Sequence, residues 1–182
     1  MRVIGGSARG RALRLDKALD IRPTAYRVRE AMFDVLSHLD LVEDASVADL
    51  FAGSGALGIE AASRGAATVV FVDSDRVAVA AIQANIESTR VGEETTCRVV
   101  RSDALAWCRA DREHFDIAFL DPPYSYEDWP SLLAIVPAEF VVIESNRAIE
   151  LPEHLALHRT YQYGTTLVTM ARRLHDQVEV VS

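Results

Sequence analysis

Cysteine is scarce in this sequence, and long apolar runs are absent. The 182 residues include only two cysteines, Cys97 and Cys108, and neither lies in a cysteine-rich spacing, which excludes a disulfide scaffold and a zinc ribbon. No run of about 18 apolar residues is present, which excludes a membrane-spanning helix. The first residues also lack the positive-then-apolar pattern of an export signal. These absences predict a cytoplasmic protein.

Charge is unevenly distributed along the chain. The length of 182 residues fits one domain, or one domain with a small appendage. Hydrophobic residues make up 49% and charged residues 25%, so the chain can bury a core. The net charge is −8, but residues 1–30 carry eight basic and three acidic side chains, so the rest of the chain carries −13. By itself such a basic run is most often a solvated surface. A basic arm also attracts phosphates, whereas an acidic body repels nucleic acid.

The first forty residues predict a hairpin and a helix. Short apolar stretches flank a glycine-rich turn between residues 2 and 15, a pattern typical of a β-hairpin. Pro23 and Thr24 then indicate a helix start, with Thr24 as the expected N-cap. Apolar residues recur at spacings of three and four from Val28 to Leu39, so the helix presents one apolar stripe to a core.

From residue 46 the sequence alternates between strand and helix patterns. Near-continuous apolar strands indicate a parallel sheet covered on both faces. The last two strands, 157–163 and 165–171, are separated only by Gly164 and must therefore pair antiparallel. The preceding elements are strands at 46–51, 68–72, 96–100, 115–120 and 139–143, and helices at 57–64, 75–89, 104–111 and 129–136.

These patterns predict an α/β, Rossmann-like fold: a mostly parallel sheet that ends in an antiparallel hairpin. We expect three parts in the chain. Residues 1–40 form a small hairpin and helix extension, residues 41–174 form the main domain, and residues 175–182 form a flexible tail.

A glycine-rich loop follows the first buried strand. Residues 49–58 read Asp-Leu-Phe-Ala-Gly-Ser-Gly-Ala-Leu-Gly, and Asp73 ends the next strand. Glycines here let a ligand approach the backbone, and a carboxylate after the second strand binds ribose hydroxyls, so the pattern predicts a nucleoside cofactor. The glycine spacing alone fits NAD almost as well as S-adenosylmethionine. Asp49 favours S-adenosylmethionine, because a carboxylate repels a pyrophosphate but attracts an ammonium and a sulfonium.

Two of the carboxylates near this loop have structural alternatives. Asp49 could merely cap the turn, although a charge at the end of a buried strand usually has a partner. Asp103 follows the third strand. We expect it either to accept a hydrogen bond from the adenine amino group or to cap the next helix, and the two roles are compatible.

The second motif, Asp121-Pro122-Pro123-Tyr124, follows the fourth strand, where open α/β folds place their sites. An exocyclic amine on a base is a poor nucleophile, because its lone pair is delocalised into the ring. The Asp121 carboxylate and the Pro122 carbonyl can accept from its N–H groups, and the prolines fix the backbone that presents them. Tyr124 offers a ring for stacking a flipped base. The alternative, an ordinary proline turn, is disfavoured by the position of the motif in the fold.

Other candidates carry less information. His154 and His158 are four residues apart, a metal-ligand spacing on a helix, but they enter an expected strand without a third ligand and are best explained as a surface pair. Neither cysteine lies in a motif that would indicate an activated thiol. Tyr126 and Trp129 either line a substrate cleft or anchor the next helix, and Glu144 either contacts substrate or caps a turn.

Taken together, these residues resemble the RsmD family of bacterial small-subunit rRNA (guanine-N2)-methyltransferases. The similarity covers residues 1 to about 172. It is carried by Arg-Val-Ile-Gly-Gly-x-x-Arg-Gly-Arg at residues 2–11, by Arg-Pro-Thr-x-x-Arg-Val-Arg-Glu at residues 22–30, by the glycine loop with the Ile-Glu-Ala-x-Ser-Arg-Gly-Ala that follows it, and by the Asp-Pro-Pro-Tyr motif. Tyr26 is a departure, since the family usually has an aspartate there.

The resemblance implies a seven-stranded methyltransferase fold with S-adenosylmethionine as methyl donor. It implies a target guanine held by Asp121, Pro122, Pro123 and Tyr124. The implied cofactor residues are Asp49, Phe51, Ala52, Gly53, Ser54, Gly55, Leu57, Asp73, Ser74, Asp103 and Ala104. The implied RNA-binding residues are Arg2, Arg9, Arg11, Arg22, Thr24, Arg27 and Arg29.

We therefore expect a metal-free enzyme that methylates the N2 amine of a guanine in 16S rRNA, either in naked rRNA or in a pre-assembled small subunit. Nothing in the sequence requires more than a monomer. Three alternatives remain: an adenine-N6 methyltransferase acting on DNA or RNA, a non-catalytic RNA-binding assembly factor on the same scaffold, and, least favoured, an NAD-dependent oxidoreductase.

Overall fold

The computed structural model describes residues 1–14, 23–111 and 113–175. Within these residues seven strands form one sheet in the order β3-β2-β1-β4-β5-β7-β6. Strands β1 to β5 run parallel, and β7 pairs antiparallel with both β5 and β6. The strands are β1 Ser46–Leu50, β2 Thr68–Asp73, β3 Thr96–Arg101, β4 Phe115–Leu120, β5 Ala138–Ser145, β6 Leu155–Tyr163 and β7 Thr166–Arg173. The expected α/β fold, with a final antiparallel hairpin, is confirmed.

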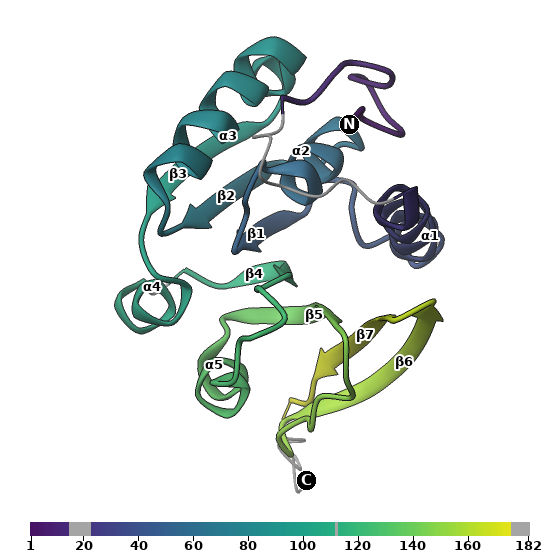
Figure 1. Cartoon of the computed structure of the whole chain (residues 1–182), viewed down its shortest axis with the longest axis vertical. Helices are drawn as coiled ribbons and strands as arrows, with labels where there is room; N and C mark the ends of the chain where they lie inside the picture. Colours follow the sequence, from purple (N-terminus) through teal and green to yellow (C-terminus); the bar gives the residue numbers. More distant parts are fainter. Residues whose placement is uncertain (15–22, 112, 176–182) are drawn as a thin grey trace, which may run out of the picture.

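Helices cover both faces of the sheet, as the continuous apolar strands predict. Figure 1 shows α1, α2 and α3 on one face and α4 and α5 on the other. Phe33 of α1 packs against Phe119 of β4 on the first face, with ring centroids 5.4 Å apart. Trp107 of α4 packs against Phe115 on the second face, at 5.7 Å. The helices are α1 Pro23–His38, α2 Ala56–Ser63, α3 Arg76–Thr89, α4 Ala104–Ala110 and α5 Trp129–Ile135, with a 3-10 turn η1 at Val91–Glu93.

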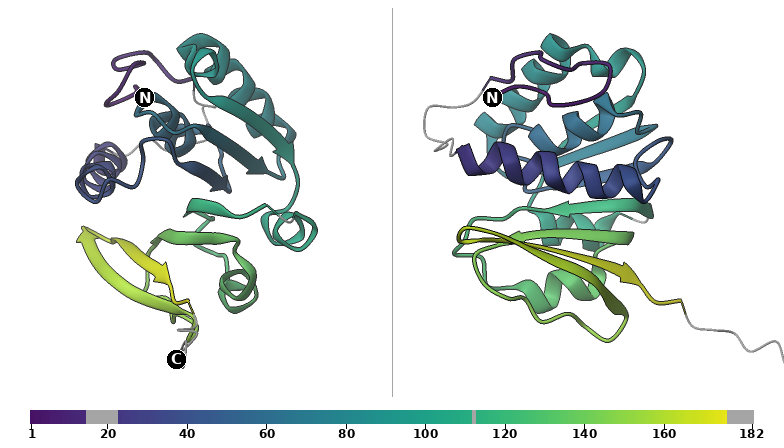
Figure 2. Two further views of the ribbon diagram at one scale, coloured as in Figure 1. Left: turned by 180° about the vertical axis from the view of Figure 1, so that it is seen from behind. Right: turned by 90° about the vertical axis from the view of Figure 1, so that its right-hand side faces the viewer.

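The N-terminal segment has less regular strand pairing than the expected β-hairpin. Its two arms lie antiparallel, but Arg2 and Ala12 form only an isolated bridge rather than a pair of strands. Backbone bonds close the loop, including those from the N–H of Val3 to the carbonyl of Arg11 (3.0 Å) and from the N–H of Leu13 to the carbonyl of Met1 (2.9 Å). We call residues 1–14 the N-terminal loop. Figure 2 shows it lying over α2 and α3.

Helix α1 begins at Pro23, so the expected N-cap at Thr24 is wrong. Thr24 lies in the first turn instead, because proline is well suited to the first helical position. The helix packs on the sheet through its predicted apolar stripe, in which Val28, Met32 and Leu36 are buried. Phe33, which the stripe did not include, is buried as well.

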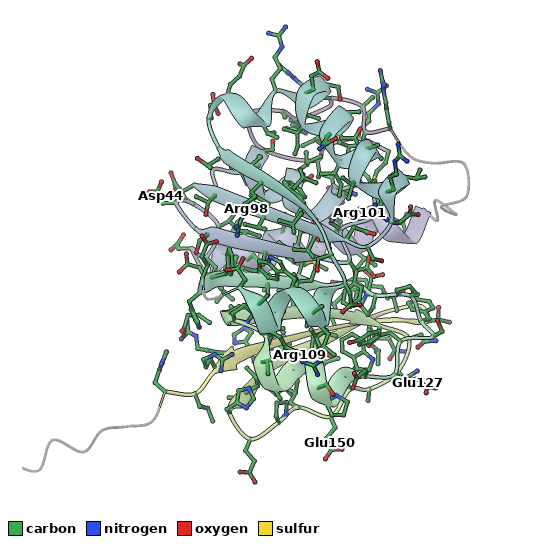
Figure 3. The ribbon with its side chains drawn as sticks, turned by 90° about the vertical axis from the view of Figure 1, so that its left-hand side faces the viewer. Asp44, Arg98, Arg101, Arg109, Glu127 and Glu150 are labelled. Atoms are coloured by element: carbon green, nitrogen blue, oxygen red, sulfur yellow. The ribbon has the colours of Figure 1, made fainter. Side chains whose placement is uncertain are left out.

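The strand order reverses between β1 and β4, which are neighbours in the sheet. A crevice forms at such a point, outside the carboxyl ends of the strands. Figure 3 shows this edge and its opposite from the side: Arg101, the last residue of β3, and Glu127 lie at one end of the molecule, and Asp44, just before β1, lies at the other. The glycine loop and the Asp-Pro-Pro-Tyr motif therefore meet at the Arg101 end.

Among the described residues, no helix is both long and apolar enough to cross a membrane. In the same part of the chain, no three His, Cys, Asp or Glu side chains gather where they could hold a metal ion. His154 bonds the carbonyl of Leu133 through Nε2 at 3.1 Å, and the ring of His158 lies edge-on to Phe140. Both histidines thus contact other parts of the chain rather than each other.

Candidate active site

Asp49 is the penultimate residue of strand β1, beneath the glycine loop, and is 1% exposed. Its Oδ2 accepts a hydrogen bond from the N–H of Gly58 at 2.8 Å, so the turn-capping role considered for this residue is present. The loop passes tightly over it, since Phe51 adopts a φ of +64°. Gly58 has no room for a side chain, because a Cβ there would lie 2.3 Å from the ring of Phe71. These contacts fix Asp49 beneath the loop, and its contact with a cofactor remains a prediction.

Asp73 joins the end of β2 to the glycine loop. Its Oδ2 accepts from the N–H of Gly53 and its Oδ1 from the N–H of Asp75, both at 2.8 Å. Ser54, in the same loop, is 7% exposed. Its carbonyl accepts a hydrogen bond from the side chain of Asn85 at 2.9 Å. The loop is therefore held by its neighbours on both sides before any ligand arrives.

The expected cofactor residues lie at the carboxyl ends of three adjacent strands. Asp49 lies near the end of β1 and residues 51–57 follow that strand, Asp73 and Ser74 lie at the end of β2, and Asp103 and Ala104 follow β3. Asp103 caps α4, since its Oδ1 accepts from the N–H of Ala106 at 2.9 Å. The helix-capping role of Asp103 is thus confirmed, and contact with an adenine amine remains a prediction.

The Asp-Pro-Pro-Tyr motif follows β4, and its last three residues form one wall of a shallow pocket. The hydroxyl of Tyr124 lies 3.2 Å from Oγ1 of Thr166. Tyr126 contacts Phe51 of the glycine loop edge-on at 5.2 Å and Trp129 at 5.3 Å. Tyr126 and Trp129 therefore line the pocket and also pack together at the start of α5, and contact with a substrate there remains a prediction. The lining residues are Pro122, Pro123, Tyr124, Tyr126, Trp129, Glu144, Ser145, Asn146 and Arg147.

Carboxylates concentrate at this edge of the sheet. The side chain of Asp121 is exposed to solvent on one side but has protein on most others. This burial raises the pKa of Asp121 well above its ordinary value, and the nearby carboxylates of Glu144 and Asp49 raise it further. Burial also raises the pKa of Asp49 to about 7, a rise that the bond from Gly58 opposes and that Asp73 reinforces. A cluster of acids with raised pKa values is typical of a functional site. Because like charges lie so close, the site favours a cation.

The expected RNA-binding residues include four that are exposed, two whose side chains are not described, and one, Arg29, that is buried. Arg2, Arg9, Arg11 and Arg27 are exposed. Arg2 also donates to the carbonyl of Gly10, and Arg11 to that of Thr89, both at 2.7 Å. Arg22 lies outside the described residues, and of Thr24 only the backbone position in α1 is described.

Arg29 corrects the expectation from the sequence. It is only 4% exposed, and its guanidinium faces inward rather than toward solvent. One amino group donates to the carbonyl of Arg2 at 2.8 Å, and Nε lies 3.8 Å from Oε2 of Glu60. Burial lowers the pKa of Arg29, which Glu60 opposes. A phosphate cannot reach this side chain in the structure, so Arg29 positions the N-terminal loop.

Sequence reasoning missed three residues that hold the site together. Arg147 donates to the backbone carbonyls of Tyr124 (3.5 Å) and Tyr126 (2.9 Å), which fixes the loop after β4. Asn85 is fully buried in α3. It bonds both the carbonyl of Ser54 and the backbone of Arg14. Glu60 is 1% exposed. It is the only charged residue of helix α2, and a single charge among mostly apolar neighbours could have indicated its buried role.

The fold and the site define a class: a Rossmann-like, seven-stranded fold of the methyltransferase type, with a glycine loop after β1 and an acceptor motif after β4. A family model described as "Conserved hypothetical protein 95" matches residues 1–172. The chain belongs to this family, which is the RsmD family.

Two curated relatives align over most of the chain. Ribosomal RNA small subunit methyltransferase D of Escherichia coli is 33% identical, over 95% of this chain and 90% of its own length. YlbH of Bacillus subtilis, whose name provisionally assigns it as an rRNA methyltransferase, is 36% identical over 95% of this chain and 99% of its own length. The solved structure of a hypothetical protein from Thermus thermophilus has a TM-score of 0.80 at 31% identity, covering 94% of this chain and 99% of that one.

Proposed function

We propose that the protein methylates the exocyclic N2 amine of a guanine in 16S ribosomal RNA, with S-adenosylmethionine as the methyl donor. The observation that carries this proposal is the meeting of an acidic glycine-loop cleft with the Asp-Pro-Pro-Tyr motif at one sheet edge. The family and the names of its curated members support the same substrate class. The fold by itself would not identify the substrate class, because proteins with one fold carry out many functions.

The cleft suits S-adenosylmethionine chemically. The cofactor carries an ammonium and a sulfonium, and the raised pKa values of Asp49 and Asp121 reflect burial together with the crowding of like charges. An arriving cation relieves this repulsion and favours the ionised forms. We assign the ribose hydroxyls to Asp73, which already bonds the glycine loop, and the Gly53–Gly58 backbone would allow close approach of the cofactor. The bound cofactor would supply an electrophilic methyl group.

The residues after β4 would prepare the amine. The Asp121 carboxylate and the Pro122 carbonyl accept hydrogen bonds from N2, which favours a tetrahedral nitrogen with a free lone pair. As the N–C bond forms and the methyl leaves sulfur, N2 must lose a proton. Asp121 is suited to take it, because its raised pKa makes it a better base than an ordinary aspartate. Tyr124 would stack on the extruded base. Orientation and preorganised electrostatics supply the rate.

The N-terminal part would guide the RNA. We assign this role to residues 1–40, the chemistry to residues 41–174, and neither role to residues 175–182, most of which lie outside the described residues. Arg2, Arg9, Arg11 and Arg27 are exposed basic side chains that can contact phosphates. We propose that the protein works as a monomer in the cytoplasm, and that its acidic body limits binding to RNA that the N-terminal part can hold.

Methyl transfer from labelled S-adenosylmethionine tests the proposal. The acceptors are naked 16S rRNA and partly assembled small subunits, and mass spectrometry identifies the product nucleoside. We expect N2-methylguanosine, and the better acceptor shows the stage of assembly. N6-methyladenosine would keep the mechanism but overturn the substrate. Cofactor binding without transfer to either acceptor would favour an assembly factor.

A matched pair of variants tests the role of Asp121. Asp121→Ala should abolish transfer while S-adenosylmethionine still binds, because the side chain acts on the acceptor amine. Asp128→Ala removes an exposed carboxylate in the same loop and should leave transfer intact. Full activity of Asp121→Ala would refute the proposed role.

A further inference from the structure

Glu144 occupies the position beside Asp121 at the edge of the sheet. In the register of β4 and β5, Leu120 pairs with Ile143, so the next position on each strand brings Asp121 next to Glu144. Leu120 and Ile143 both point into the core under α4 and α5. Side chains alternate along strands, so the following residues face the opposite side, where Asp49 also lies. Glu144 lines the same pocket as Pro122 and Tyr124.

The strand and the turn around Glu144 have other supports. The backbone of Glu144 pairs with Val168 in the β5–β7 ladder, which does not involve the side chain. The turn after β5 contains a side-chain hydrogen bond from Ser145, whose Oγ donates to the carbonyl of Arg147 at 2.7 Å. A second acid placed beside Asp121 raises the electrostatic energy of the site, and the repulsion from Glu144 contributes to the raised pKa of Asp121. A ligand with two adjacent donors would lower this repulsion by donating to both carboxylates.

Guanine has this arrangement on its Watson–Crick edge. Its N1–H and its N2 amine are neighbouring donors, whereas adenine presents an unprotonated N1 that accepts hydrogen bonds. The Asp121 carboxylate and the Pro122 carbonyl take the N2 amine in the proposed function. An ionised carboxylate only accepts hydrogen bonds, so a second one beside the first suits N1–H and repels the N1 lone pair of adenine.

We propose that Glu144 accepts the N1–H of the target guanine and is the residue that selects guanine over bases without that proton. This inference rests on the proposed function, because it assigns the neighbouring contact of the same base. A site built to bond an N–H rejects the analogue that lacks it far more strongly than a shape-based pocket would.

The test compares two target bases in otherwise identical RNA. The methylated guanine is mapped with the wild-type protein, and 2-aminopurine then replaces it. This base keeps the N2 amine but has no N1–H. We expect the wild type to prefer guanine by at least ~100-fold in kcat/KM. Glu144→Gln should reduce that preference by roughly 10-fold or more, because the glutamine amide can donate to the bare N1. 2-Aminopurine also lacks the O6 atom of guanine, but this difference affects the wild type and Glu144→Gln alike.

Glu139→Gln is the matched control, since it makes the same change at the other end of β5, where Glu139 pairs with His114 and His175. It should leave the preference unchanged. Efficient methylation of 2-aminopurine by the wild type would overturn the inference without any variant. An unchanged base preference in Glu144→Gln, with guanine still methylated, would overturn this inference alone. Absence of N2-methylguanosine with the wild type would overturn the proposed function and this inference with it.

Discussion

Asp49 is a buried acid whose ionisation should oppose folding. Burial raises its pKa from 3.8 to about 7 despite the hydrogen bond from Gly58. For an acid with a raised folded-state pKa, the folded protein binds more protons than the unfolded chain between these two values. Stability from this group is therefore full below pH 4 and is lost as pH rises toward and through 7. The Asp49→Asn variant carries no such charge, so this component of the pH dependence should disappear.

The magnitude follows from the size of the pKa shift. A rise of about 3 pKa units corresponds to about 4 kcal/mol of unfolding free energy lost well above pH 7. At pH 5 most of the native protein still holds the proton. The difference in stability between Asp49→Asn and the wild type should therefore grow in favour of the variant by roughly 2–3 kcal/mol between pH 5 and pH 8.

Urea unfolding of the cofactor-free proteins at the two pH values measures this difference. Glu150→Gln, which removes an exposed carboxylate, is the control and should show no such growth. S-adenosylmethionine should stabilise the wild type at pH 8 and have much less effect on Asp49→Asn, because the variant lacks the charge that attracts the cofactor. A stability difference that stays the same at pH 5 and pH 8 would show that Asp49 is ionised throughout, and the electrostatic account of the cleft would fail.

Three further predictions concern the scaffold around the cleft. Gly58→Ala should destabilise the protein by about 1–3 kcal/mol in urea unfolding, because the new Cβ would lie 2.3 Å from the buried ring of Phe71; a neutral result would mean that the ring can move. Asp75→Ala removes the N-cap of α3 and should cost about 1 kcal/mol, measurable as a lower Tm, whereas Asp75→Asn should restore most of it. Burial raises the pKa of Cys108 to about 12, so a thiol reagent at pH 8 should label it only in urea, and rapid labelling of the native protein would contradict this.

Most of the fold followed from local pattern, because each central strand is buried on both faces and reads as a short apolar run. The expected strand 115–120 matches β4, and the other strand limits differ by at most two residues at either end. The N-terminal loop was harder to predict. Its arms have too few residues to form paired strands and depend on α2 for partners, and a contact over more than fifty residues leaves no local periodicity in the sequence.

The site divides in the same way. Residues that follow a strand, such as Asp49, Asp73 and Asp121, were predictable because the carboxyl ends of parallel strands meet at one edge. Arg147 and Asn85 were not, since each acts by bonding the backbone of a distant loop. Arg29 was expected among the RNA-binding residues, and its burial does not fit that role, for a related reason. A basic residue in a basic run looks solvated until its acidic partner, Glu60, is brought to it by the fold.

That partner explains how the N-terminal loop is held relative to the cofactor cleft. Glu60 accepts from the N–H groups of Ile4 and Gly5 at 2.8 Å and from Arg64 at 2.9 Å. A buried ion pair such as Arg29 with Glu60 adds little net stability, because both charges lose their hydration. Removing the carboxylate, however, would leave one buried and one partly buried backbone donor without an acceptor. The pair is therefore best understood as a positioning device. Helix α2 begins at the glycine loop and carries Glu60 in its second turn, so one short helix sets the distance between the cofactor loop and the basic loop that would hold the RNA.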